Sequence, residues 1–274
     1  MISSQTLKIT NWTAAAIHFT QAAYWIHVKN KNETFDTPLE IYTNRIKNVG
    51  GIPIVINEPL GDNPDLETLL ITFFLVTGAF HTFYALDLGG LYSEALANQN
   101  NYYRWLEYSI TATIMINIVA RSAGVNDQEA LILMNAATVG TMLQGQIVET
   151  TLANRGNITL VDRNKNVIAA TLVGWILMLS VFGVIIKKFN ETIADVETFA
   201  NVDIPDWIPA VVWSQFIFYN IFGFWQLWHI LQSNNPNFDY SNIEMGYNVL
   251  SITSKTVLGG ILGYGLQQAN NRDT

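Results

Sequence analysis

One lysine occupies a position at which a basic side chain could do chemistry. Thirteen of the fourteen Lys and Arg residues lie at the ends of apolar stretches or between them, whereas Lys255 lies ten residues into the last stretch. A lysine at the centre of a bilayer costs about 2.5 to 3.5 kcal/mol, so it is normally retained for function. The structural alternative is a side chain that reaches the interface. At about 16 Å from the nearer helix end, Lys255 is too deep for that.

The chemistry that a buried lysine offers is attack of its amine on an aldehyde. Desolvation favours the neutral amine, which is the form that makes a Schiff base. Retinal is the aldehyde that suits an apolar pocket, and the protonated imine is a buried cation that requires a carboxylate. Glu107 is the one acid well inside any apolar stretch of the sequence. We therefore expect Glu107 to be the counterion.

The composition indicates that these residues belong to a membrane protein. Only 13% of the 274 residues are charged and 50% are hydrophobic, against about 25% charged in ordinary soluble chains. The chain has no Cys, which excludes disulfides and thiolate chemistry. Its net charge of −8 argues against nucleic-acid binding.

Seven stretches have the length and low charge of membrane helices. The seven stretches are residues 9–28, 68–86, 102–120, 130–148, 167–186, 207–231 and 245–266. Five of the seven contain no charged residue. In lipid, backbone N–H and C=O groups must form their hydrogen bonds within a helix or within a closed barrel. Stretches of this length are too long for barrel strands, so they predict helices. We predict an all-α, seven-helix membrane bundle that forms one domain, residues 1–274.

Two connections are predicted to carry structure of their own. The extramembrane loop 29–67 holds seven acids and a β-prone run at 52–56, which predicts a small β hairpin cap. Residues 191–209 are acidic with apolar residues at helical spacing, which predicts a helix extension along the membrane surface. Five basic residues lie in connections on the N-terminal side and eight on the other. This count alone favours an N-terminus outside the cell.

Two segments resemble the heliorhodopsins, which are retinal proteins distantly related to the microbial rhodopsin pumps. They are RWLEYS at 104–109 and VLSITSK at 249–255, and the similarity extends over all seven stretches. The resemblance implies that all-trans retinal is bound covalently to Lys255, that Glu107 is its counterion and that Ser251 lies beside the chromophore. It also implies a bundle of rhodopsin type, a cytoplasmic N-terminus and a homodimer through the fourth and fifth helices.

Two histidines are predicted to lie near the Schiff base. Counted from the N-terminal side, Glu107 and His81 lie at a depth of about 7 Å, His18 at about 13 Å and Lys255 at about 16 Å. A pocket of two imidazoles could accept the proton that the Schiff base releases in light. The alternative for each histidine is an ordinary hydrogen-bonded buried residue, and the resemblance, which includes histidines at both positions, favours the pocket.

The rest of the predicted retinal pocket rests on helical spacing and on the resemblance. Aromatic and Met stripes at this spacing are more often ordinary packing than cofactor contacts. The predicted lining comprises Ser251, Tyr108, Thr111, Met115, Thr138, Met142, Gly145, Trp175, Phe218, Tyr219, Phe222 and Gln226.

The pattern on the third stretch favours a photosensor over a proton pump. Rhodopsin pumps set an acceptor and a donor at i and i+11, positions about 20° apart around a helix. Here the pair is Glu107 and Ile118, and Ser251 stands where pumps keep a second carboxylate. The donor is therefore missing, and one negative charge balances one positive charge. We expect a light-driven shape change that an unidentified signalling partner reads.

Two further classes of function stay open. One is a passive light-gated path for protons or cations, with Glu107 and Glu149 on one side and the acidic run Glu191, Asp195 and Glu197 on the other. A solvated surface helix is the favoured interpretation of this run. The other class is a receptor without chromophore, or an enzyme that uses Lys255 as an imine-forming catalyst. We do not expect an enzyme, because no second acid and base lie at a suitable depth. No metal site is predicted.

Overall fold

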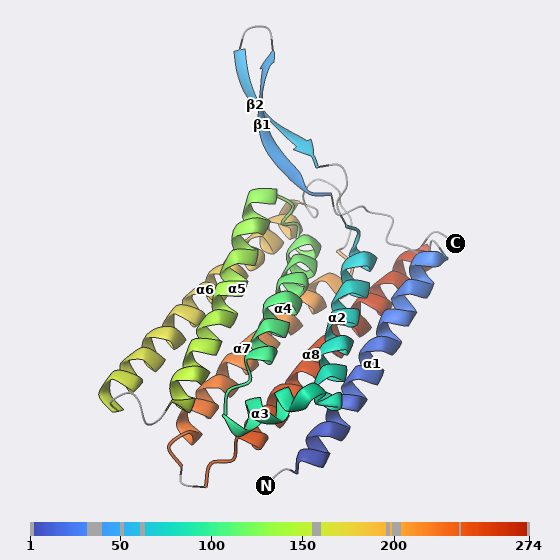
Figure 1. The fold of residues 1–274 in the computed structure, drawn as a ribbon. Coiled ribbons are helices and arrows are strands. Elements are labelled where there is room, and N and C mark those ends of the chain that lie inside the picture. Colours follow the sequence, from blue (N-terminus) through green and yellow to red (C-terminus); the bar gives the residue numbers. More distant parts are fainter. Residues whose placement is uncertain are drawn as a thin grey trace.

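The computed structural model describes residues 3–31, 40–49, 52–60, 64–154, 160–195, 198, 204–235 and 237–272, and shows long helices with one protruding hairpin (Figure 1). In chain order the elements are α1 (Ser4–Asn30), β1 (Tyr42–Val49), β2 (Ile52–Pro59), α2 (Leu66–Leu86), η1 (Leu88–Gly90), α3 (Leu91–Ala97), α4 (Tyr102–Ser122), α5 (Gln128–Ala153), α6 (Leu160–Asp195), α7 (Trp207–Gln232) and α8 (Tyr240–Arg272). Each of the seven predicted stretches falls inside one long helix, namely α1, α2, α4, α5, α6, α7 and α8.

Capping side chains fix where several of these helices begin. The Asp65 side chain accepts the backbone N–H of Thr68 at 2.7 Å, and Asp127 accepts that of Ala130 at 2.8 Å. Each bond satisfies one of the N–H groups that the first turn of a helix leaves without a partner. The sequence therefore sets the first turns of α2 and α5 locally, before any packing.

Five helices are long and apolar enough to cross a membrane among the residues that the structure describes. They are α2, α5, α6, α7 and α8. The other two long helices carry buried polar residues in their middle and first turns, Asn11 and His18 on α1 and Arg104 and Glu107 on α4. These residues lower the hydropathy of both helices although they face the protein interior. The five apolar helices show a multi-pass membrane protein, while crossing by α1 and α4 stays a prediction.

The predicted hairpin is confirmed. β1 and β2 pair antiparallel from Val49 and Ile52 to Tyr42 and Pro59, and the hairpin protrudes at the end of the bundle opposite the N-terminus (Figure 1). Its base is tied to the start of α5, since the Tyr42 N–H donates to the Asn126 carbonyl at 2.7 Å.

Charged side chains pair across the hairpin. Lys47 and Arg45 on β1 both form ion pairs with Glu58 on β2. The hydrogen bond from Lys47 is the main reason that the pKa of Glu58 lies below its usual value. Such pairs are screened at an exposed site and contribute little to stability, but they favour this register of the two strands.

The connection from α2 to α4 contains structure that the sequence did not predict. Asp87 ends α2 in the left-handed region (φ 49°), and Gly89 and Gly90 follow with φ of 66° and 75°. The Asp87 carboxylate accepts the N–H groups of Tyr92 and Ser93, which start the short helix α3. This turn places α3 at the N-terminal end of the bundle (Figure 1).

The predicted extension of the fifth long helix is confirmed as far as Asp195, where α6 ends. Glu191 lies on this extension with its side chain 50% exposed, and forms an ion pair with Lys187 one turn earlier at 3.7 Å. This is the arrangement of a solvated surface helix. Glu197 lies outside the described residues.

Helix α4 lies at the centre of the core and packs against α2, α5 and α7. Its last turn is buried, with Ile118, Val119 and Ala120 each 0% exposed among apolar side chains of the same cluster. Ile118 is the residue at the position where a pump would carry its proton donor. The structure surrounds it with apolar groups.

Candidate functional site

Lys255 and Glu107 form a buried ion pair between α8 and α4. The Lys255 Nζ lies 2.8 Å from Oε1 of Glu107, and the two side chains are 4% and 1% exposed. The Nζ also lies over the rings of Phe73 and Tyr108, at 5.6 and 5.5 Å from their centroids. Such a contact with aromatic faces attracts a cation electrostatically. The site therefore holds one positive and one negative charge side by side.

The second oxygen of Glu107 has a partner that the sequence analysis missed. The Tyr84 hydroxyl donates to Oε2 at 3.2 Å, so each carboxylate oxygen has its own donor. Tyr84 lies one turn after His81 on α2. This spacing could have indicated that both residues face the same site.

The two predicted histidines lie together. Their rings stack with centroids 5.8 Å apart, and both residues are buried. The Nδ1 of His81 lies 2.8 Å from Oδ1 of Asn11, and the Nδ1 of His18 lies 3.1 Å from Oε1 of Gln21. Both imidazoles lie within electrostatic range of Lys255. The depth estimate therefore placed these groups in the same region correctly.

The hydrogen bonds assign the proton on the ring of His81. The Nδ2 of Asn11 donates to the Leu7 carbonyl at 3.0 Å, which leaves Oδ1 as an acceptor. Since an amide oxygen cannot donate, Nδ1 of His81 carries the hydrogen and Nε2 carries a lone pair. The Nε2 atoms of His18 and His81 are buried, and neither has a hydrogen-bond partner among the described residues. Each is therefore available to accept a proton.

A cavity of about 860 Å³, counted to include its open part, extends from Lys255 between α4, α5, α6, α7 and α8. Its walls are mainly apolar and aromatic, as is usual for small-molecule pockets. Nine of the twelve residues predicted for the pocket line it: Tyr108, Thr111, Met115, Met142, Gly145, Trp175, Tyr219, Phe222 and Gln226.

Three predicted residues do not line this cavity. Phe218 lies about 100° around α7 from Tyr219, outside the stripe that faces the space. Thr138 lies one turn before Met142 on α5 and lines a separate, smaller cavity. Ser251 is buried one turn before Lys255, but the α8 residues that line the cavity are Tyr247, Ser254 and Lys255.

The lining also includes residues that the sequence analysis did not select, among them Trp105, Tyr247 and Met178. Trp105 packs directly on Gly145, where a Cβ would lie 2.1 Å from the indole ring. Gly145 thus contributes by its lack of a side chain. A glycine facing a tryptophan at helical spacing could have indicated this contact.

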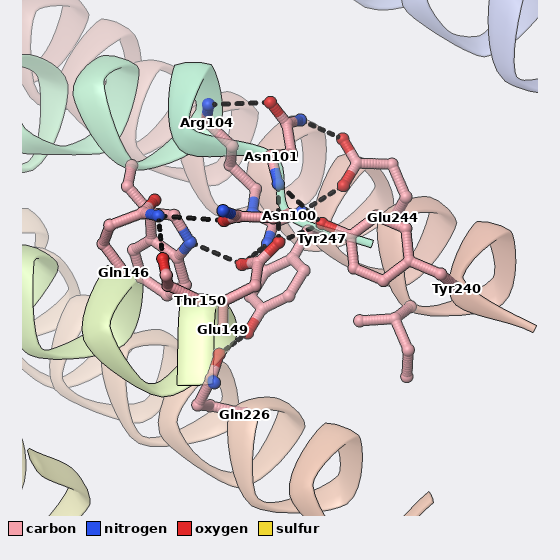
Figure 2. Close-up of polar contacts among 12 residues, drawn as sticks. Asn100, Asn101, Arg104, Gln146, Glu149, Thr150, Gln226, Tyr240, Glu244 and Tyr247 are labelled. Atoms are coloured by element: carbon pink, nitrogen blue, oxygen red, sulfur yellow. Dashed lines mark hydrogen bonds and ion pairs between the residues drawn. The ribbon is translucent and has the colours of Figure 1, made fainter. Parts of the chain in front are cut away.

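A second group of buried charges corrects the expectation that Glu107 is the one acid inside the bundle. Arg104 lies between Glu149 at the end of α5 and Glu244 at the start of α8, and forms an ion pair with each (Figure 2). All three residues are at most 1% exposed. The sequence analysis missed Glu244 because it lies one residue before the apolar stretch, and it treated Arg104 as a residue of the helix end.

Asn101 joins this group, which we call the Arg104 cluster: Arg104, Glu149, Glu244 and Asn101. The Asn101 side chain caps α4 by accepting the N–H of Arg104 at 3.3 Å, and its Nδ2 donates to Oε1 of Glu244 at 2.7 Å (Figure 2). The cap of α4 therefore fixes both Arg104 and the carboxylate opposite it. Glu149 is held in a buried ion pair, whereas the side chain of Glu191 is exposed.

Comparison with known proteins agrees with this arrangement. No curated protein matches the chain. The heliorhodopsin family model matches residues 7–265 of the 274, a range that includes both buried charge clusters and all of the cavity lining. The chain therefore belongs to the heliorhodopsin family, whose members are light-sensing membrane proteins with a retinal chromophore.

Proposed function

We propose that this protein is a photoreceptor in which all-trans retinal is bound covalently to Lys255 as a protonated Schiff base and Glu107 is the counterion. The observation that carries the proposal is the Lys255 Nζ, 2.8 Å from Glu107 and in the wall of a largely apolar cavity. We further propose that all seven long helices cross the membrane.

The residues fit retinal by their chemistry. The aromatic and Met side chains of the cavity exclude water, and Trp175 and Met178 line it on α6. When bound, retinal supplies absorption of visible light and the isomerisation that follows. Glu107 then balances the positive charge at Nζ, because a buried cation without a partner would be strongly destabilised.

His18 and His81 are proposed to accept the proton that leaves Nζ after light absorption. Both Nε2 atoms are buried acceptors with no hydrogen-bond partner in the part of the chain that the structure describes. The rings stack, so a proton on one is close to the other, and only one of the two can hold a charge at low cost. The pair thus offers one proton site inside the bundle.

The surroundings of Ile118 favour a sensor over a pump. A pump would need a group there that returns a proton from the hairpin end, whereas Ile118 is 0% exposed in the apolar core. The proton therefore stays within the local polar pocket, and the bundle changes shape for a signalling partner to read. A passive proton or cation path through Glu149 and Glu191 is the alternative, and the ion pair of Glu149 with Arg104 argues against it.

Orientation and assembly are proposals that follow from family membership. We propose a cytoplasmic N-terminus, although the basic residues in the connections favour the opposite orientation. We also propose a homodimer in the lipid membrane through the two helices α5 and α6. Exposed apolar residues on these helices, such as Leu133 and Ile176, are consistent with an interface or with lipid.

Expression with added retinal, followed by visible spectroscopy and voltage-clamped photocurrent recording on the same material, tests the proposed function. The proposal predicts a coloured protein without sustained current at any voltage. A directional photocurrent would establish a pump, and a current that reverses with the applied voltage would establish the passive path. A colourless protein would contradict the photoreceptor itself.

A further inference from the structure

The Arg104 cluster has one positive charge for two carboxylates. The guanidinium forms ion pairs with Glu149 through Nη2 and with Glu244 through Nη1, and both carboxylates are 0% exposed. If both were ionised, the cluster would hold one uncompensated buried negative charge. Two carboxylates that share one partner favour a state in which one of them keeps its proton.

Glu149 is the carboxylate that must be ionised, because its partners donate hydrogen bonds to it. Trp105 Nε1, Arg104 Nη2 and the backbone N–H of Asn101 are groups that can only donate. The fourth partner, the Tyr240 hydroxyl, accepts the same Asn101 N–H at 3.1 Å and so directs its own hydrogen to Glu149. None of these four hydrogen-bond partners is therefore placed to accept a proton from Glu149.

Glu244 has a partner that can accept. Its Oε2 faces Arg104, and its Oε1 receives the Nδ2 of Asn101. The remaining partner of Oε1 is the Tyr92 hydroxyl at 3.2 Å, and a hydroxyl can turn to accept instead of donate. A hydrogen on Oε1 of Glu244 would therefore have the Tyr92 oxygen as its acceptor.

We propose that Glu244 is a neutral carboxylic acid that stores one proton, with Oε1–H donating to Tyr92, while Glu149 is the ionised partner of Arg104. This assignment neutralises the cluster and keeps every hydrogen-bonded pair named above, with the bond between Tyr92 and Glu244 reversed in direction. It makes Glu244 a second proton site in the bundle, separate from the histidine pair.

Two tyrosines connect this proton site to the Lys255–Glu107 pair. The rings of Tyr92 and Tyr84 have centroids 4.9 Å apart, and the Tyr84 hydroxyl donates to Glu107 at 3.2 Å. A change in charge or position at Glu107 therefore acts on Tyr84, which packs on the acceptor of the Glu244 proton. This coupling to light rests on the proposed function, whereas the proton on Glu244 does not.

His229 is the other group that could carry the balancing proton. It is buried on α7, its ring stacks on Phe238 with centroids 5.7 Å apart, and it lies within electrostatic range of Glu149. A proton on His229 would allow both carboxylates to be ionised. The test must therefore distinguish a carboxylic acid at Glu244 from an imidazolium at His229.

Infrared spectroscopy of the purified protein in the dark, with and without retinal, makes this distinction. The difference between the wild type and Glu244→Gln is predicted to contain the C=O stretch of a carboxylic acid, which His229→Gln retains. Glu149→Gln should lose the same band, because Glu244 then becomes the carboxylate that alone balances Arg104 and ionises. Glu244→Gln, a neutral replacement for a neutral acid, should lower the melting temperature less than Glu149→Gln does. If Glu244→Gln instead removes only carboxylate bands, the stored proton is disproved, with or without pigment.

Light-minus-dark infrared spectra test the coupling on the retinal-bound protein. The account predicts a shift of the Glu244 C=O band on illumination, and a smaller or absent shift in Tyr92→Phe. A Glu244 band that is unchanged by light in a protein that photoisomerises normally would disprove the coupling while leaving the dark-state assignment and the photoreceptor proposal intact.

Discussion

Tyr84 donates its hydroxyl hydrogen to the oxygen of Glu107 that Lys255 leaves free, at 3.2 Å. The carboxylate is thus shared between a cation and a neutral donor from a third helix, α2. Both contacts draw negative charge away from any group bound at Nζ, but the ionised carboxylate itself dominates the field there.

Glu107→Gln removes the counterion charge and keeps the side-chain shape. The ground state of the bound chromophore has its positive charge near Nζ, so loss of the carboxylate is predicted to destabilise it relative to the excited state and to shift absorption to the red. Tyr84→Phe serves as the graded comparison and should shift the maximum less. Unchanged spectra in Glu107→Gln would show that another carboxylate is the counterion.

The histidine pair is tested by His81→Phe, His18→Phe and the double variant. If the imidazoles accept the proton from Nζ, each single variant lowers the amount of the light-induced, deprotonated, blue-absorbing species, and the double variant lowers it most. Flash photolysis with detection in the near ultraviolet measures this species. Normal accumulation in the double variant would assign the acceptor elsewhere.

Gly145→Ala tests the packing that shapes the cavity. Its new Cβ would lie 2.1 Å from the Trp105 ring, so the indole must move, at a cost of about 1 to 3 kcal/mol in a packed core. The melting temperature should fall and the absorption maximum should change. Gly183→Ala on α6 is the matched control, since its Cβ meets no atom within 4 Å. Equal effects of the two substitutions would contradict the proposed contact.

The ion pair of Asp65 at the hairpin end of the bundle should make the stability of the protein depend on pH. Burial alone would raise its pKa, but hydrogen bonds from Lys29 and Thr68 outweigh it, and the pKa of Asp65 lies below its usual value. A carboxyl with a lowered folded pKa contributes stability above its unfolded pKa and loses it as pH falls through the folded pKa. Because the side chain is 49% exposed, the effect is at most about 1 kcal/mol.

Thermal unfolding of the wild type and Asp65→Asn across the acidic range measures this contribution. The amide keeps an oxygen that can cap α2 but loses the charge that pairs with Lys29. The difference in melting temperature should therefore be largest above the usual pKa of aspartate and shrink toward acid. A difference that grows as the pH falls would have the wrong sign for this account.

The sequence was most informative where one residue broke a long apolar pattern. Lys255 and Glu107 stood out because a charge inside a membrane stretch is costly, and the structure brings the two side chains into contact. The positions of the seven long helices followed from the length and low charge of the stretches. The hairpin followed from a β-prone run after two glycines.

The other residues of the two sites could not be predicted, because their roles depend on side chains from different helices that meet only in the folded protein. Glu244, Arg104 and Tyr92 each lie near the end of a helix, where a polar residue is ordinary. Their contacts with one another join α3, α4 and α8, so they form only in the folded bundle. Phe218 was assigned to the cavity because it lies one turn from Phe222. Which residues of α7 face the cavity depends on how the helix is rotated about its axis against its neighbours. Spacing along one helix does not give that rotation.

The most direct test of the central claim is to locate the chromophore. The protein is incubated with all-trans retinal, reduced with borohydride and digested, and the peptides are analysed by mass spectrometry beside a Lys255→Ala control. The account predicts a visible pigment with a retinyl adduct on the peptide that contains Lys255, and neither colour nor adduct in the control. An adduct on another lysine, or a colourless wild type, would contradict it.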